Sequence, residues 1–539
     1  MRGFFSTGVK QLCTMQGKKH YTEKLFSNFQ LSEYVPKENF YRRLREQLEL
    51  KFIYSRTTHL YGSTGNPGID PVVFFKLMLV SYLENITSDR HLIEHCKMRL
   101  DILFFLGYDL DENLPWHSTV SRTRQLYDEP LFEELFSKVF TMCVESGMVS
   151  GHTQAVDSAY IKANASMESV EQKQAPTERV NEFLQKGNKE NLPQRKAKEN
   201  KASSEQQTIT SSAKELNQLN TRNEYFKENK IEQHGNKVEK TFQSFSNQTH
   251  YSPTDPDARI STKPGKPRQL NYLCNMAVDT AEGVITHIQA DYADRKDSRY
   301  LTDITTKTKE ELENNNLNLE NVLADTGYSS GINYHELEKQ NITPYIPTSG
   351  VYKHERDGMT YNKQEDYFTC RNNKKLVHKK TYTNTAGALM KSYRSTRKDC
   401  RDCPFKKTCL GKVAQEKKLE LSYYQEEYER AWKRQQTKRF KRMVRVRAGT
   451  VEPVFGNLIN YYGLRKINVK GKAGAHKCML MSAIAFNLKK LMKFLNKKLN
   501  VKVVALQGQQ LAFLKSLFAK VISSKISYLV FSTPQLRFK

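Results

Sequence analysis

Apolar positions recur at helical spacing through residues 20–150, which predicts a helical N-terminal domain. Asp70 followed by Pro71 is a typical helix start, because the carboxylate accepts hydrogen bonds from the first-turn N–H groups and proline has no N–H there. A second helix is predicted to begin after Ser88, and a longer amphipathic helix covers 131–149.

The segment Pro115-Trp-His-Ser-Thr-Val-Ser-Arg-Thr-Arg predicts a short helix that Ser118 caps and that presents Arg122 and Arg124. Two closely spaced helices of this kind resemble a helix-turn-helix motif, which would contact DNA. An ordinary helical bundle gives the same pattern, so the sequence leaves both interpretations open.

The pattern changes to alternating apolar positions after residue 250. Strands are predicted over 271–279 and 283–291, joined by a turn, and two shorter strands end near Asp325 and Pro347. Helices are predicted at 298–313 and 334–339 between them. Strands that alternate with helices indicate an α/β or mixed sheet.

The domain boundaries follow these changes in pattern. Residues 166–250 are polar and charged with weak periodicity, so we expect a disordered or loosely helical insertion. The predicted parts are a helical domain at 20–150, a core at 151–165 and 251–350 interrupted by that insertion, a second insertion at 351–428, a basic helical part at 429–498 and a basic tail at 499–539.

The net charge of the chain indicates which class of partner it binds. The 539 residues hold 86 Lys or Arg against 58 Asp or Glu, a net charge of +28, which points to nucleic acid first and to an anionic membrane second.

A membrane-spanning segment is disfavoured, because the apolar stretch 511–531 is interrupted by lysines. The basic stretch 1–20 leaves a transit peptide open, and no signal peptide is evident. Nine cysteines, several isolated in apolar runs, indicate a reduced, cytosolic compartment.

The positive charge is concentrated in the last 110 residues. From Arg430 onward there are 25 Lys or Arg and a single acid, Glu452. We expect this region to bind phosphate, and we expect the isolated carboxylate to serve a task that needs negative charge, such as holding a cation. Thr450 and Pro453 predict that a helix begins here, with Glu452 in its first turn.

Two aspartates lie within or directly after predicted strands. Asp157 lies among small and apolar residues, and Asp325 ends the run Val-Leu-Ala-Asp. Each has a simpler interpretation as the acid of a turn. Together with Glu452 they would hold two Mg²⁺ or Mn²⁺ ions for phosphoryl transfer. The aspartates at 255 and 257 and those at 291, 294 and 297 form two further candidate groups, for which turn and surface acids are the simpler interpretation.

Three cysteines, Cys400, Cys403 and Cys409, have the spacing of a zinc knuckle. Cys370 is the best candidate for the fourth ligand, with His378 in reserve. A redox role for the Cys-x-x-Cys pair fits less well, because a third cysteine lies close by.

Taken together, several ordered motifs resemble the DDE transposases of bacterial insertion sequences. They are Val-Asp157-Ser, Thr-Asp255-Pro-Asp257-Ala, Leu-Ala-Asp325-Thr-Gly-Tyr, the cysteine knuckle and Gly-Thr-Val-Glu452-Pro-Val-Phe-Gly followed by Leu-Arg-Lys. The Pro-Trp-His-Ser-Thr segment resembles part of the helical domain that such transposases carry. The resemblance spans roughly 25–495 and does not cover 166–250.

This resemblance implies a fold and a function. The fold is an RNase H-like mixed-sheet core with insertions, between a helical N-terminal domain and a basic helical C-terminal region. Asp157, Asp325 and Glu452 would be the metal-binding triad that cuts element ends and joins the 3′-hydroxyl to target DNA. The implied partners are terminal inverted repeats, target DNA and at least one further copy of the chain, in the bacterial cytoplasm at the nucleoid.

The sequence departs from the family around the glutamate. Ile459 and Ala448 occupy places where the wider family often has Lys and Arg. We expect DNA contacts from other basic side chains, namely Arg122, Arg124, Arg445, Arg447, Arg465, Lys466 and Lys470. Two rival functions stay open: a catalytically silent DNA-binding protein derived from a transposase, and a metal-dependent nuclease that cleaves without joining.

Overall fold

The computed structural model describes residues 29–62, 68–174, 210–228, 245–262, 267–349, 358–385, 387–411 and 413–498. The expectations for the basic N-terminal stretch and for the tail at 499–539 lie outside these residues. None of the helices in the described part is both long and apolar enough to cross a membrane.

The N-terminal region is helical, as predicted. Asp70 caps α4, accepting from the N–H groups of Val72 at 2.7 Å and Val73 at 3.1 Å, and Pro71 opens the helix. Because α4 is apolar on nearly all faces, its neighbours surround it. The helices are α1 (Leu31–Tyr34), α2 (Phe40–Gln47), α3 (Phe52–Thr57), α4 (Pro71–Leu83), α5 (Asp89–Lys97), α6 (Leu100–Leu106), α7 (His117–Leu126) and α8 (Glu129–Glu145).

A mixed sheet forms the centre of the molecule, which confirms the predicted fold class. The order is β6-β5-β1-β7-β8, and β4 (Arg259–Ser261) extends the β6 side of β5. β5 is antiparallel to both β1 and β6, whereas β1, β7 and β8 are parallel. The strands are β1 (Thr153–Lys162), β5 (Gln269–Asp279), β6 (Ile285–Tyr292), β7 (Asn321–Leu323) and β8 (Thr343–Tyr345).

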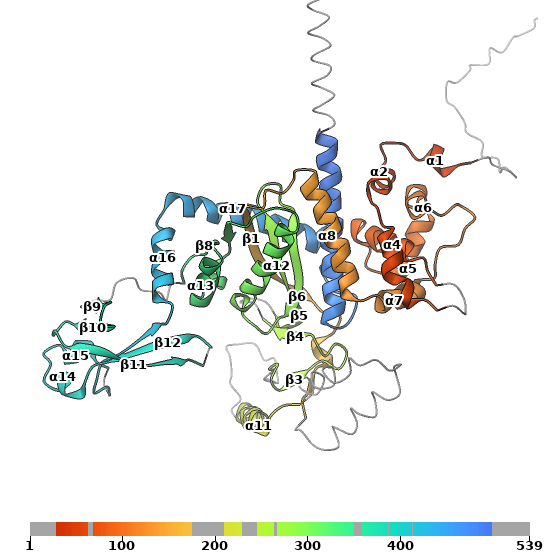
Figure 1. The fold of residues 1–539 in the computed structure, drawn as a ribbon. Helices are drawn as coiled ribbons and strands as arrows, with labels where there is room; N and C mark the ends of the chain where they lie inside the picture. Colours follow the sequence, from red (N-terminus) through yellow and green to blue (C-terminus); the bar gives the residue numbers. More distant parts are fainter. Residues whose placement is uncertain are drawn as a thin grey trace, which may run out of the picture.

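Helices from the second half of the chain pack on this sheet (Figure 1). α12 (Leu301–Glu313) contacts β5 and β6, and α13 (Gly331–Lys339) contacts β8 and α16 (Gln425–Gln435). α17 (Lys438–Tyr461) crosses β1, β5, β7 and β8. Sequence segments nearly 300 residues apart are therefore adjacent at the middle of the sheet.

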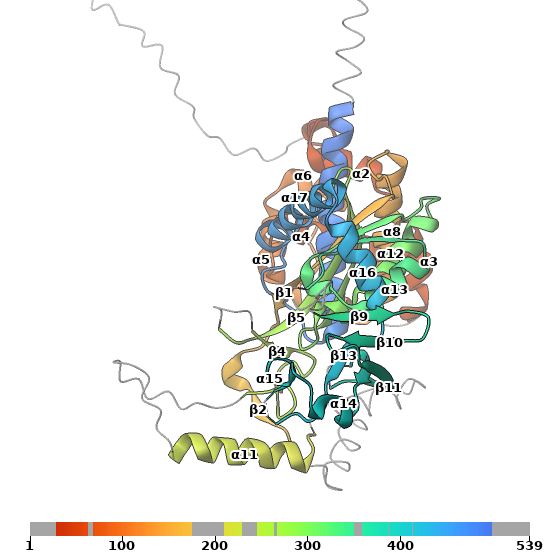
Figure 2. The same cartoon turned by 90° about the vertical axis from the view of Figure 1, so that its left-hand side faces the viewer.

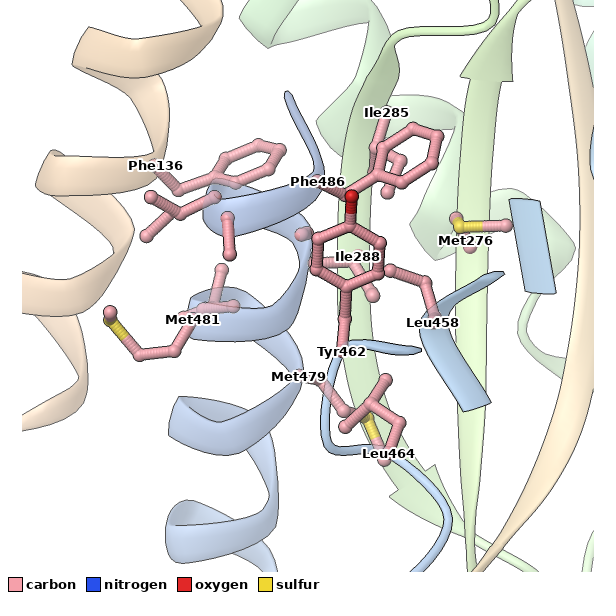
Figure 3. Close-up of a cluster of buried hydrophobic side chains, with 14 of the residues drawn as sticks. Phe136, Met276, Ile285, Ile288, Leu458, Tyr462, Leu464, Met479, Met481 and Phe486 are labelled. Carbon is pink, nitrogen blue, oxygen red and sulfur yellow. The ribbon is translucent and has the colours of Figure 1, made fainter. Parts of the chain in front are cut away.

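The helix of residues 472–498 joins the sheet to the N-terminal region. Its Phe486 meets Tyr462 edge to face at 5.7 Å beside Ile285 and Ile288 of β6, while Met481 lies on the side of α8 (Figure 3). Asn487 pairs with both the N–H and the C=O of Ile285, at 3.0 and 2.9 Å. These bonds satisfy backbone groups of β6 that β5 leaves unpaired.

A second, antiparallel sheet lies in the predicted insertion between residues 351 and 428. Its order is β13-β12-β11-β10-β9, and its small core consists of Phe368, Leu376, Tyr393 and Leu421. It forms the lobe on the left of Figure 1, beyond α16, and comes to the front in Figure 2. Its elements are β9 (Met359–Asn362), β10 (Tyr367–Cys370), β11 (Lys375–Thr383), β12 (Leu389–Arg394), α14 (Arg397–Arg401), α15 (Lys406–Cys409) and β13 (Lys418–Ser422).

The first insertion, at 166–250, is described in part. It contains the helix α11 (Ala213–Glu228) and a short ladder between β2 (Glu171–Gln172) and β3 (His250–Tyr251). Residues 175–209 and 229–244 lie outside the described part.

Two predicted helix starts are wrong. Thr450 does not begin a helix: α17 starts at Lys438, capped by Thr437, and passes through Pro453. Burial of Phe440, Val451 and Val454 on one side keeps the helix continuous although proline removes one hydrogen bond. Ser118 lies inside α7, whose N-cap is Trp116.

Candidate active site

The parallel pairing of β1 with β7 brings two of the predicted acids together. Ala155 of β1 is opposite Leu323 of β7, so Asp157 and Asp325 occupy matching places two residues further along. β7 ends before Asp325, which caps the short helix η4 (Thr326–Tyr328) by accepting from the Gly327 N–H at 2.8 Å. The turn interpretation of Asp325 is therefore correct locally, and the turn also holds its carboxylate beside Asp157.

The third acid reaches the same place from α17. The Arg447 Nη1 donates to Asp157 Oδ2 at 3.0 Å, and Arg447 Nη2 lies 3.6 Å from Glu452 Oε1. The Asp157 side chain is 20% exposed and that of Glu452 is 64% exposed. Arg447 thus contacts Asp157 and Glu452, and these two acids with Asp325 are here called the acid triad.

The electrostatics of Asp157 reflect burial in a group of acids. Loss of water raises the pKa of its carboxyl, and the neighbouring Asp325 raises it further. The Ser158 N–H, 2.8 Å away, and the Arg447 guanidinium lower the pKa. An ionised Asp157 therefore depends on nearby positive charge.

A fourth carboxylate adjoins the triad. Asp297 lies in the short helix η3 (Asp297–Arg299), which contacts η4. A Cβ placed on Gly327 would lie 3.0 Å from Asp325 Oδ1 and 3.6 Å from Asp297 Oδ2. Burial raises the pKa of Tyr328, and the charges of Asp297, Asp157 and Asp325 add to that rise. Sequence reasoning interpreted Asp297 as a surface acid, because its local pattern carries no sign of this packing.

The acids at 255 and 257 have a structural task that the surface-acid interpretation missed. Asp255 is fully buried and accepts from the Tyr272 hydroxyl at 2.6 Å and from the Gly471 N–H at 3.0 Å. Asp257 accepts from the Lys472 N–H at 2.9 Å. The two carboxylates satisfy free N–H groups at the start of the helix of residues 472–498.

The predicted DNA-contacting side chains fall into three groups. Arg122, Arg445, Arg465, Lys466 and Lys470 are exposed. Arg447 is 15% exposed and belongs to the triad region. Arg124 is buried and pairs in a bidentate manner with Asp89, at 3.0 and 2.5 Å. Its guanidinium is directed into the helical domain, so we leave Arg124 out of the DNA surface.

The four cysteines lie in the second insertion. Cys370 ends β10, Cys400 is in α14 and Cys409 ends α15. These three cysteines and Cys403 are free thiols of intermediate exposure. The Cys400 Sγ lies 3.1 Å from Ser395 Oγ. The reserve ligand His378 lies on β11, with its Nε2 3.1 Å from the Thr381 hydroxyl. Within the described residues, no three His, Cys, Asp or Glu side chains are close enough to hold a metal ion.

Comparisons with known proteins match both ends of this arrangement to transposase domains. Residues 29–126 match the family described as Transposase domain (DUF772), and residues 369–492 match the Transposase DDE domain. The chain therefore carries two transposase domains, which is consistent with a DDE transposase of an insertion sequence. A search of curated proteins finds no match to this chain.

The two matched regions contain some of the candidate site residues and leave others out. The DDE match contains Glu452, the cysteines and the whole of α17, and the N-terminal match covers α1 to α7. Asp157 and Asp325 lie outside both matches, so their assignment depends on the sheet register.

DDE transposases, whose domain matches residues 369–492, generally use divalent metals, and the donors of the acid triad are of a type that binds them. Its donors are carboxylate oxygens, which suit Mg²⁺ and Mn²⁺. The cysteine sulfurs are of the type that binds zinc.

Proposed function

We propose that this transposase binds the ends of its element, cleaves DNA there and joins the 3′-hydroxyl ends to target DNA. The observation that carries the proposal is the convergence of Asp157, Asp325 and Glu452 from β1, β7 and α17. The strand order β6-β5-β1-β7-β8, with β5 antiparallel to its neighbours, supports an RNase H-like core in which the first strand carries the first acid.

Asp157, Asp325 and Glu452 would hold two divalent cations. Bound there, the cations would activate water or a 3′-hydroxyl and stabilise the leaving oxygen of an in-line displacement at phosphorus. The protein contributes one acid on β1, a second directly after its paired strand β7, and a third on a helix that crosses both strands. Because Glu452 is largely exposed, the site is open on the side of α17, where DNA can reach it.

Exposed basic residues near the site would hold the DNA. Arg445 lies on α17, and Arg465, Lys466 and Lys470 lie in the segment that follows it. Each phosphate contact contributes affinity that falls as salt rises. We place Arg122 of α7 on the surface that binds the element ends, and we expect at least a dimer on DNA, acting in the cytoplasm at the nucleoid.

The experiment compares cleavage with binding for variants of the acid triad. Asp157→Asn, Asp325→Asn and Glu452→Gln should each abolish Mg²⁺- or Mn²⁺-dependent cleavage of DNA that carries the element's ends. DNA binding should persist, because the basic surface is unchanged. Asp294→Asn, which alters only a weak pair with Arg259 at 3.7 Å, is the matched control. Normal cleavage by any triad variant would remove that residue from the assignment.

A catalytically silent DNA-binding protein is the competing function. Tight, salt-sensitive binding by wild type without cleavage under either metal would favour it. Cleavage of element ends without joined products would instead favour a nuclease.

A further inference from the structure

Arg447 occupies a place in α17 where a charge needs a partner. It lies on the same side of the helix as Val451, Val454 and Leu458, which are all buried. Its own side chain is only 15% exposed. A guanidinium in such surroundings is stable only when an anion compensates it.

That compensation comes from the acid triad. Arg447 makes a charge-assisted hydrogen bond to Asp157 at 3.0 Å, and its other terminal nitrogen lies 3.6 Å from Glu452. The guanidinium therefore links an acid on the sheet to an acid on the helix. In this place it supplies the positive charge that a divalent cation would supply.

The balance of charge points the same way. The Asp157 side chain is only 20% exposed, so its carboxylate needs partners close by. Of the groups that contact its carboxylate, the Ser158 N–H belongs to the backbone of β1, whereas Arg447 is a side chain whose position can change without moving the strand. Arg447 also lies between Asp157 and Glu452, and among the described residues no three such side chains form a ready metal site as they stand.

We propose that Arg447 is a positioning residue that stands in for the metal, holding Asp157 and Glu452 together until a divalent cation binds and displaces it. The inference depends on the proposed function, because it takes the acid triad as the metal site. Once displaced, a poorly hydrated guanidinium needs another anion, and a DNA phosphate is the anion that this site receives. Metal binding and DNA binding are then coupled through one side chain.

The first test measures Mn²⁺ binding to the full chain without DNA, by the loss of free Mn²⁺ signal in electron paramagnetic resonance. Arg447→Gln should bind Mn²⁺ about 10- to 100-fold more tightly than wild type, since the cation no longer has to replace a charge-assisted hydrogen bond. Arg442→Gln, which alters an exposed arginine on the same helix, should stay within about twofold of wild type. Equal or weaker binding by Arg447→Gln would overturn the inference.

A second test needs no substitution and stays informative if that variant fails to fold. Phenylglyoxal modifies accessible guanidinium groups, and mass spectrometry locates each modified arginine. Mn²⁺ should increase modification of Arg447 severalfold, whereas Arg124, held by Asp89, should not change. Unchanged reactivity of Arg447 at saturating Mn²⁺ would show that the cation does not displace it.

Asp157→Asn separates the inference from the proposed function. If this variant loses Mn²⁺ binding while Arg447→Gln behaves as wild type, the metal site stands and the role of Arg447 is wrong. If Asp157→Asn binds Mn²⁺ as wild type does, the metal site itself is wrong, and the inference falls with it.

Discussion

The ion pair between Arg124 and Asp89 gives the sharpest prediction about stability. Both Arg124 terminal nitrogens reach the Asp89 carboxylate, and the side chains are 11% and 19% exposed. Arg124→Met removes the charge and leaves the Asp89 carboxylate in a largely dry place. Breaking a buried pair in this way costs about 3–5 kcal/mol, and we expect about 3 kcal/mol because Asp89 retains some contact with water.

The assay is thermal unfolding followed by circular dichroism. A loss of about 3 kcal/mol should lower the first transition by roughly 6–12 °C. Arg122→Met, two residues earlier and exposed, should change stability by no more than about 0.5 kcal/mol. The double variant with Asp89→Asn should recover much of the loss, because both charges are then removed.

The same two variants should also differ in their effect on DNA binding. Arg122→Met should weaken binding and reduce the slope of log affinity against log salt by about 0.9, the value for one phosphate contact. Arg124→Met should leave that slope unchanged at a temperature where it is folded. An Arg124→Met variant as stable as wild type, or one that loses a phosphate contact, would refute the argument.

Three further predictions concern other parts of the fold. Asp255→Asn should lower stability by about 1–3 kcal/mol in denaturant titrations, because it weakens the hydrogen bonds to Tyr272 and Gly471; an unchanged midpoint would contradict this. Cys403→Ser should lower both bound zinc, measured by elemental analysis, and the melting temperature, and a wild type without zinc would disprove the knuckle. Burial lowers the pKa of His287 to about 4, so the folded chain binds that proton more weakly than the unfolded chain. Stability should then fall by about 2 kcal/mol from pH 6.5 to pH 4, and His287→Gln should remove that part of the loss.

Much of the secondary structure was predictable because its signals are local. Asp70 and Pro71 mark the start of α4, because the capping hydrogen bonds lie within one turn. The alternation of apolar and polar residues likewise predicted the antiparallel strands β5 and β6. Turn chemistry at Asp325 was likewise visible from its own neighbours.

The errors have a common cause, which is contact between distant segments. Pro453 looked like a helix start, but burial of Phe440 and Val451 against the core extends α17 through it. Arg124 looked like a ligand for phosphate, yet its partner is 35 residues earlier in the chain. Asp255 looked like a turn acid, whereas it holds a helix that begins more than 200 residues later.

The acids of the site could be predicted from the sequence, whereas their arrangement could not, because it depends on contacts between distant segments. The places of Asp157 and Asp325 at predicted strands, the isolation of Glu452 among basic residues and the resemblance to DDE transposases were enough to propose the three acids. The register of β1 against β7, which places Asp157 beside Asp325, exists only once the sheet has formed. Arg447 was expected to bind phosphate, and no pattern in the sequence indicated that it would pair with Asp157 and Glu452.

One measurement tests the central claim most directly: metal-dependent cleavage and joining, followed on one labelled DNA that carries the element's end, in the presence of unlabelled target. Wild type should give cleaved and joined products with Mg²⁺ or Mn²⁺, and Glu452→Gln should give neither while still binding the DNA. Glu429→Gln, which alters only an exposed pair with Lys433, should act as wild type. Joined products from Glu452→Gln at the wild-type rate would contradict the account.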